Sequence, residues 1–273
     1  MGLSRRIRGF LREKRCEYVT AKHVKYDNLF NYDIPSCLVY QPDESKVANE
    51  VIYCFWTGDN EMSENRRAAF EELILISECE VKLVTPKNLS DYILDEYPLH
   101  PAYQYLSCVH KADYLRCYFM YHHGGGYSDI KGATHSWKPL FDKLNGDHTK
   151  FALGCPETYS WYIAYSHDFI EGYEFSNLNT EMRKHFPYLI GNTAYIFKPY
   201  SPFSKIWITE LHRRLDVVYE NLKENPGNVW GDNAGYPIPW NSILGQIFHP
   251  LSLICYKQII RDKRIACNLS NYR

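Results

Sequence analysis

An apolar run, a capped helix and a second apolar run constrain the fold more than any other feature of this chain. Residues 51–56, VIYCFW, have the length and the β-branched and aromatic content of a buried strand. After a polar turn, Ser63 is placed to cap a helix that runs to about residue 77, and a second strand at 81–86 ends in proline. A strand, helix and strand in this order predict an α/β fold whose mostly parallel central sheet is flanked by helices.

The rest of the chain continues this alternation of helices and strands. A helical pattern is followed by three glycines, which accept the left-handed backbone that ends a helix. A later Ser-Pro pair is typical of a helix start, and a Pro-Gly pair is typical of a helix end. The expected elements are a helix over 102–122, short strands at 127–130, 151–157 and 192–199, and a long helix from Ser201 to about residue 225.

The composition is that of a soluble globular protein. The chain has 273 residues, 45% of them apolar and 23% charged, with a net charge of -1, so nucleic acid is not an expected partner. Nine scattered cysteines without a C-x-x-C pair favour reduced thiols and a cytoplasmic location. We expect an N-terminal arm over 1–49, a main domain over 50–255 and a C-terminal tail over 256–273.

The first fifteen residues, MGLSRRIRGFLREKR, are basic and carry a few apolar side chains. A short basic helix with Ile7, Phe10 and Leu11 on it could touch an anionic membrane surface. A solvated arm explains the same residues. Peripheral membrane contact is therefore one of two readings of this segment.

The segment from His110 to Gly132, HKADYLRCYFMYHHGGGYSDIKG, concentrates the residues that suggest chemistry. Asp113 and Arg116 lie three residues apart on a helix that is otherwise largely apolar, so we expect them to be paired and partly buried. They serve either a ligand or only the scaffold. Asp129 follows a short strand, at the edge where open α/β sheets bind ligands. The order helix, glycines, strand excludes a P-loop and a Rossmann fingerprint.

These residues resemble the core of DXD-type sugar transferases, in particular the family 32 glycosyltransferases, which are mannosyltransferase-like, and the capsular polysaccharide synthesis proteins. The resemblance rests on His110–Asp113, Arg116, Tyr121 and Gly124–Asp129. The stretch VIYCFWTGDNEMSENRR upstream is similar to the first strand and loop of that family. Downstream, PLF near Leu140 and YPIPWNSILGQIFHP are also similar, so the likeness covers about residues 50–250.

The resemblance implies a GT-A-like fold and a retaining, hexosyltransferase-like activity in polysaccharide biosynthesis. A sugar would move from a nucleoside-diphosphate-sugar donor to a hydroxyl of a glycan or glycolipid acceptor. Asp129 matches the first acid of the D-x-D motif. The residues that match donor-binding positions are Trp56, Thr57, Asp113, Arg116, Gly125, Gly126 and Tyr127.

Lys131 stands where the family has its second acid, so the motif is a D-x-K variant. In the family the two acids hold Mn²⁺ or Mg²⁺ against the donor diphosphate. Three readings remain open. Asp129 holds the metal together with donor oxygens, water and another side chain, for which His249 is a candidate; or the Lys131 ammonium takes over the work of the metal. Alternatively, the chain is a non-catalytic carbohydrate- or nucleotide-binding module.

Two later segments are candidates for the acceptor side. Asp232, in the loop VWGDNAGYPIPW, could orient a hydroxyl, act as a base or simply form a turn. The segment ETYSWYIAYSHD carries four aromatic residues, which could stack on sugar rings or pack in an interface. The second possibility would suit a structural interaction protein, which is the remaining rival hypothesis.

Overall fold

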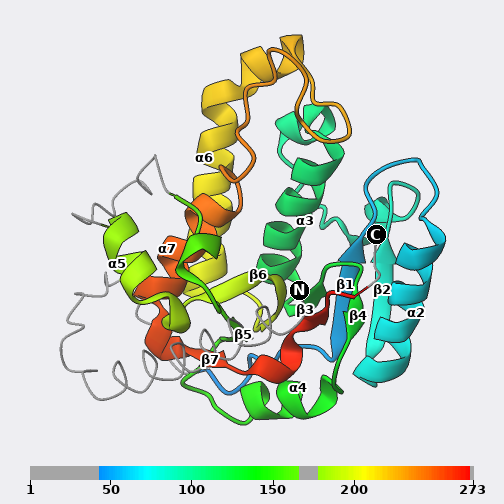
Figure 1. Ribbon diagram of the computed structural model, residues 1–273. Coiled ribbons are helices and arrows are strands. Elements are labelled where there is room, and N and C mark those ends of the chain that lie inside the picture. Colours follow the sequence, from blue (N-terminus) through cyan, green and yellow to red (C-terminus); the bar gives the residue numbers. More distant parts are fainter. Residues whose placement is uncertain (1–42, 166–177, 271–273) are drawn as a thin grey trace, which may run out of the picture.

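The computed structural model describes residues 43–165 and 178–270 and shows an α/β protein (Figure 1). The predicted membrane-contacting segment lies outside the described residues. Where the chain is described, no helix is long and apolar enough to cross a membrane. The helices and strands are β1 (Val51–Phe55), α2 (Glu64–Ser77), β2 (Glu80–Val84), α3 (Cys108–His122), β3 (Gly125–Ser128), β4 (Gly132–Ala133), α4 (Lys138–Asn145), β5 (Ala152–Pro156), α5 (Leu178–Lys184), β6 (Ile190–Phe197), α6 (Pro202–Glu224), α7 (Gly245–Ile254), β7 (Ile259–Arg261) and β8 (Cys267–Asn268).

The central sheet has six strands in the order β2-β1-β3-β6-β5-β7. The pairs β2/β1, β1/β3 and β5/β7 are parallel, whereas β6 is antiparallel to both of its neighbours. Within this sheet β6 alone therefore runs against the other strands, which confirms the prediction of a mostly parallel sheet. A separate two-stranded sheet joins β4 to β8.

The predicted strand–helix–strand unit is present because its local signals agree with one another. Side chains of β1 alternate between the two faces of the sheet, with Ile52 and Cys54 in one apolar cluster and Tyr53 and Phe55 in the other. The Ser63 side chain accepts a hydrogen bond from the Arg66 amide and so caps α2. The parallel pairing of β1 with β2 then follows from the helical crossover between them.

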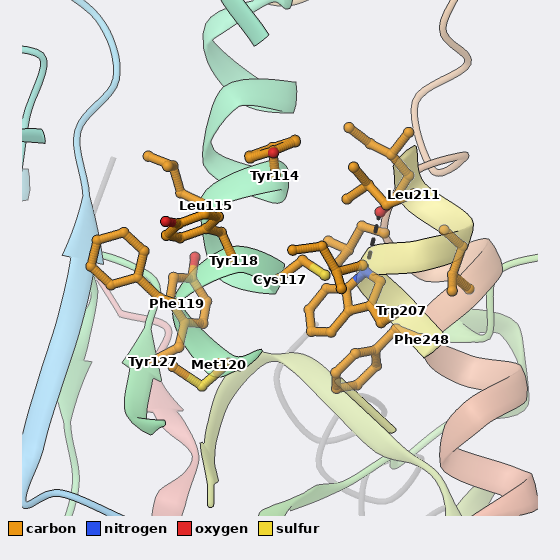
Figure 2. Packing of buried hydrophobic residues seen from close by; sticks show 14 of the residues in the cluster. Tyr114, Leu115, Cys117, Tyr118, Phe119, Met120, Tyr127, Trp207, Leu211 and Phe248 are labelled. Atoms are coloured by element: carbon orange, nitrogen blue, oxygen red, sulfur yellow. Dashed lines mark hydrogen bonds between the residues drawn. The ribbon is translucent and has the colours of Figure 1, made fainter. Parts of the chain in front are cut away.

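Two apolar cores lie on opposite faces of the sheet. One contains side chains of α3, α6 and α7, and the other contains side chains of α2 and α4. Figure 1 shows α3 and α6 side by side on their face of the sheet, and α4 below it. In Figure 2, Cys117 of α3 points toward Trp207 of α6, whose ring packs against Phe248 of α7. Packing against α6 and α7 fixes the position of α3, and therefore the positions of the residues that α3 presents at the edge of the sheet.

The predicted helix over 102–122 is in fact two helices. A 3-10 helix, Pro101–Tyr105, is followed by extended backbone at Leu106 and then by α3. The Ser107 side chain accepts from the His110 amide and starts α3. Apolar spacing continues across this break, so the sequence pattern could not show it. The break matters because it sets where α3 begins and hence where Asp113 and Arg116 lie.

The described part of the predicted C-terminal tail is not a tail. Residues 259–261 form β7, which pairs with β5 in the central sheet, and residues 267–268 form β8, which pairs with β4. The expected boundary at residue 255 is therefore wrong in this respect. Strands of two or three residues leave almost no periodic signal, and they depend on partners more than a hundred residues away. No disulfide joins two cysteines within residues 43–165 and 178–270.

A half-buried histidine on α6, His212, gives the folded state a sensitivity to acid. His212 Nε2 lies 2.9 Å from the Tyr114 hydroxyl. Burial, and then the nearby His100 and His122 charges, lower the pKa of His212 to about 4, although Asp216 opposes this. The unfolded chain, with an ordinary histidine pKa of 6.5, therefore takes up this proton first as the pH falls.

We expect the neutral His212 ring to contribute to the free energy of unfolding. The contribution is fully present above the histidine pKa of the unfolded chain, and it is lost as the pH falls toward the pKa of His212 in the folded protein. Because the ring is partly exposed, the contribution is about 1–2 kcal/mol between about pH 7 and pH 4.5. Urea unfolding of wild type and His212→Gln at both pH values measures it, with the exposed His135→Gln as control. Equal acid losses in wild type and His212→Gln would contradict the prediction.

Candidate active site

Four charged side chains meet where α3 faces the end of β3. Arg116 Nη2 lies 3.5 Å from Asp113 Oδ1 and 3.3 Å from Asp129 Oδ1. Lys131 Nζ lies 2.8 Å from Asp129 Oδ2. These four side chains are between 5% and 18% exposed, so the charges are largely withdrawn from water. We call Asp113, Arg116, Asp129 and Lys131 the charged cluster; the predicted pairing of Asp113 with Arg116 is confirmed.

Tyr127 and two backbone carbonyls complete the surroundings of the cluster. The Tyr127 hydroxyl donates to Asp129 Oδ1 over 2.6 Å, and its ring lies 4.6 Å from the Arg116 guanidinium carbon. Arg116 Nη1 donates to the Asn192 carbonyl, and the Asp129 amide donates to the Thr193 carbonyl. Each carboxylate oxygen of Asp129 therefore already faces a donor or a cation.

Glycine backbone geometry places β3 so that Asp129 reaches the cluster. Gly124 and Gly125 have φ values of +64° and +88°, which side-chain-bearing residues rarely adopt. A Cβ at Gly125 would lie 2.8 Å from the Val51 carbonyl oxygen. The predicted role of these glycines in ending the helix is confirmed, although Gly125 and Gly126 already belong to β3. The close approach of β3 to β1 is possible because Gly125 has no side chain.

The buried charges shift the pKa values of the two acids in opposite directions. Burial raises the pKa of Asp113, and the Arg116 and His110 charges only partly offset it. Burial also acts to raise the pKa of Asp129, but Arg116 and Lys131, together with hydrogen bonds from Lys131 and Tyr127, hold it below its usual value. The two cations beside Asp129 therefore favour its ionised form, which accounts for the lower of the two pKa values.

Two other segments, α2 and β8, hold the chain around Lys131 in place. Arg66 of α2 donates from Nη1 to the Ile130 carbonyl over 2.8 Å. Immediately after Lys131, Gly132 pairs with Asn268 of β8. Asn268 in turn donates to the Glu72 carboxylate. The C-terminal strand, which the sequence did not identify, thus supports the loop that carries Asp129 and Lys131.

The predicted nucleotide loop leaves the sheet beside Asp129. The β1/β3 register pairs Tyr53 with Tyr127, so continuing both parallel strands brings Trp56 and Asp129 to the same edge. Trp56 Nε1 donates to the Asn60 carbonyl. Thr57 Oγ1 donates to the Cys108 carbonyl and thereby ties the loop to the start of α3. This edge is the carboxyl end of the parallel strands, where such folds bind ligands.

His110, for which we predicted no separate role, joins α3 to the later polar loop. Its Nδ1 lies 2.8 Å from the Tyr236 hydroxyl, and the two rings stack with centroids 5.5 Å apart. Its Nε2 lies 3.3 Å from the Trp240 carbonyl. Burial lowers the pKa of His110, although the Asp113 charge opposes the shift. The only hint in the sequence was its place three residues before Asp113.

Asp232 lies on the same loop but has its own local partners. Its side chain is exposed, and Oδ1 accepts a hydrogen bond from Asn228 Nδ2 over 2.7 Å. No contact in the described part of the chain joins it to the charged cluster. This geometry is that of a loop turn, and a catalytic role for Asp232 stays a prediction.

His249 is buried in α7 and has partners other than Asp129. The Ala164 amide donates to its Nδ1, and its Nε2 lies 3.4 Å from Glu157 Oε1. Nowhere among residues 43–165 and 178–270 does a group of three or more His, Cys, Asp or Glu side chains have an arrangement that could hold a metal ion. With Lys131 against Asp129 Oδ2, the residues present do not fit the Mn²⁺ or Mg²⁺ site that the resemblance implies.

The aromatic segment after β5 forms an exposed group of rings. Tyr159 and Trp161 stack with centroids 4.5 Å apart and an angle of 8° between their planes. Trp161, Tyr162 and Tyr165 are each at least half exposed. Exposed flat rings of this kind suit sugar faces as well as protein interfaces, so the two alternatives for this segment remain.

The fold and the charged cluster together define an α/β protein with a polar site at the carboxyl edge of its parallel strands. Residues 28–149 match a family model described as a glycosyltransferase sugar-binding region containing a DXD motif. The matched segment includes the whole charged cluster, and it supports a glycosyltransferase of the DXD type. Neither the curated proteins nor the solved structures contain a significant match to this chain.

Proposed function

We propose that this protein is a glycosyltransferase with a GT-A-like fold. It would move a sugar from a nucleoside-diphosphate-sugar donor to a hydroxyl of a glycan or glycolipid. The observation that carries the proposal is the charged cluster at the carboxyl edge of β1 and β3, beside the Trp56–Thr57 loop and inside the matched sugar-binding region. DXD domains generally use nucleotide sugars, so the match supports a donor of this class.

We assign different parts of the donor to different residues of the site. Trp56 and Thr57 lie where the base and ribose would enter, and Lys131 provides positive charge for the diphosphate. Asp113, whose pKa is raised, offers a carboxyl group to sugar hydroxyls, and Arg116 keeps the acids in position. A retaining, hexosyltransferase-like reaction suits this site, because the leaving diphosphate can itself take the acceptor proton and no separate base is required.

The acceptor side is proposed to lie beyond the cluster. The loop that carries Asp232 and the rings of residues 159–165 are the segments assigned to it, with polysaccharide or glycolipid synthesis as the setting. Family 32 and capsular transferases are the groups that the motif resembles. We place the reaction in the cytoplasm, with contact to a membrane through the basic N-terminal segment.

The proposal is tested with a panel of UDP and GDP sugars. We expect at least one of them to raise the melting temperature and to release its nucleoside diphosphate faster than a blank without protein. Asp129→Asn, which preserves side-chain shape, should remove the release and leave the protein folded. Absence of both a melting shift and nucleotide release across the panel would overturn the proposal.

A second candidate function is a non-catalytic nucleotide- or sugar-binding module. It is favoured by one observation, the replacement of the second acid of the motif by Lys131. The same panel separates the two functions. A melting shift without any nucleotide release, including with oligosaccharide acceptors, would assign binding alone.

A further inference from the structure

The charged cluster is balanced in charge without a metal ion. Two carboxylates, Asp113 and Asp129, face two cations, Arg116 and Lys131. With an acid at position 131, three carboxylates would surround one guanidinium and leave two negative charges, which a divalent cation would neutralise. The lysine therefore replaces both the second acid and the charge that a metal would bring.

The geometry around Asp129 leads to the same conclusion. Its Oδ1 faces the Tyr127 hydroxyl and Arg116, and its Oδ2 faces the Lys131 ammonium at 2.8 Å. Mn²⁺ and Mg²⁺ prefer several oxygen ligands in one shell. A cation at Asp129 would have to displace an ammonium that is only 12% exposed and lies on a loop braced by Arg66 and β8.

We propose that Lys131 binds the donor diphosphate directly and that this protein binds its donor without a divalent metal. The inference rests on the proposed function, and it names the cationic group of the same site. An ammonium has three N–H donors, so a bond to Asp129 is compatible with a bond to a phosphate oxygen. Asp129 then acts as a positioning residue that holds the ammonium toward the edge of the sheet.

The transfer step is balanced with these groups. The bond between the anomeric carbon and the diphosphate oxygen breaks, and a bond forms between the same carbon and the acceptor hydroxyl oxygen. The hydroxyl proton passes to the departing diphosphate, and nothing is oxidised or reduced. Lys131 stabilises the negative charge that develops on the leaving group, which is the contribution that a metal makes in D-x-D enzymes.

The test measures binding by calorimetry, with UDP and GDP as probes. For wild type we expect the same dissociation constant, within about twofold, in EDTA and in Mn²⁺. Lys131→Met should weaken binding about 10- to 100-fold, the range of a charge-assisted hydrogen bond. Lys131→Asp, which restores the D-x-D pattern, should bind only with Mn²⁺. Lys138→Met, an exposed lysine on α4, is the matched control and should bind like wild type.

The outcomes separate this inference from the proposed function. Nucleotide binding that requires Mn²⁺ in wild type, or that is unchanged in Lys131→Met, overturns the inference and leaves the glycosyltransferase proposal standing. No nucleotide binding in either buffer removes both. The comparison of EDTA with Mn²⁺ in wild type needs no variant, so it decides the matter even if Lys131→Met fails to fold.

Discussion

Replacing Arg116 with methionine is expected to lower the free energy of unfolding by about 3–5 kcal/mol, because it leaves two buried carboxylates without their shared cation. Arg116 lies between Asp113 and Asp129, and its ring contact with Tyr127 and hydrogen bond to the Asn192 carbonyl are lost as well. Methionine keeps much of the side-chain volume, so the loss reports on charge and hydrogen bonding more than on a cavity.

Urea unfolding measures the cost of Arg116→Met, and two further variants identify its cause. Adding Asp113→Asn to Arg116→Met removes the carboxylate that Arg116 alone pairs with in the cluster, whereas Asp129 keeps Lys131, and should recover part of the stability. Arg264→Met removes an exposed arginine from Asp262, which keeps Lys143 as a partner, so we expect a much smaller loss of stability than in Arg116→Met. Equal losses in Arg116→Met and Arg264→Met would contradict the view of the cluster as a buried network.

Much of the fold could be predicted from the sequence because its signals are local. The apolar run of β1 and the caps at Ser63 and Ser201 act over a few residues, and each is found as expected. The break before Ser107 was missed because apolar residues continue at helical spacing on both sides. Strands β7 and β8 were missed because their hydrogen bonds, and not their own residues, define them.

The candidate site divides in the same way. Asp113 and Arg116 could be paired from their spacing on a helix, and Asp129 could be placed from the end of a strand. The contact of His110 with Tyr236 joins residues 126 positions apart, and no pattern in one sequence reports such a distance. The contact between Lys131 and Asp129 depends on the backbone path of the loop between them, so it could not be predicted from the sequence. Arg66 and β8, which are distant in the chain, hold that loop.

The arrangement would accommodate either an acid or a lysine at position 131 in the same fold. Lys131 lies after the end of β3, and its loop is held by contacts from Arg66 to the Ile130 carbonyl and from β8 to Gly132. These are backbone contacts, so they do not depend on the side chain at 131. The same backbone framework could therefore present either an Asp–Asp pair or an Asp–Lys pair, and the charge of the site would differ while the sheet would not.

Gly125→Ala is expected to lower the free energy of unfolding by about 2–4 kcal/mol and to disturb the charged cluster at the same time. The backbone at Gly125 has φ +88°, and an added Cβ would lie 2.8 Å from the Val51 carbonyl oxygen and 3.3 Å from that of Asn49. Both neighbours are backbone atoms of the segment that leads into β1, so neither can rotate away. The strain must move β3 relative to β1, and Asp129 lies at the far end of that short strand.

Denaturation measures the stability cost of Gly125→Ala, and nucleotide binding measures its effect on the site. Gly146→Ala is the matched control, because its φ of -74° is ordinary and the added Cβ would meet only the Asp142 carbonyl oxygen at 3.1 Å. We expect the control to change stability by less than about 1 kcal/mol. If the two alanine variants behaved alike, the close approach of β3 to β1 would not be what positions Asp129, because the chain would tolerate a side chain between them.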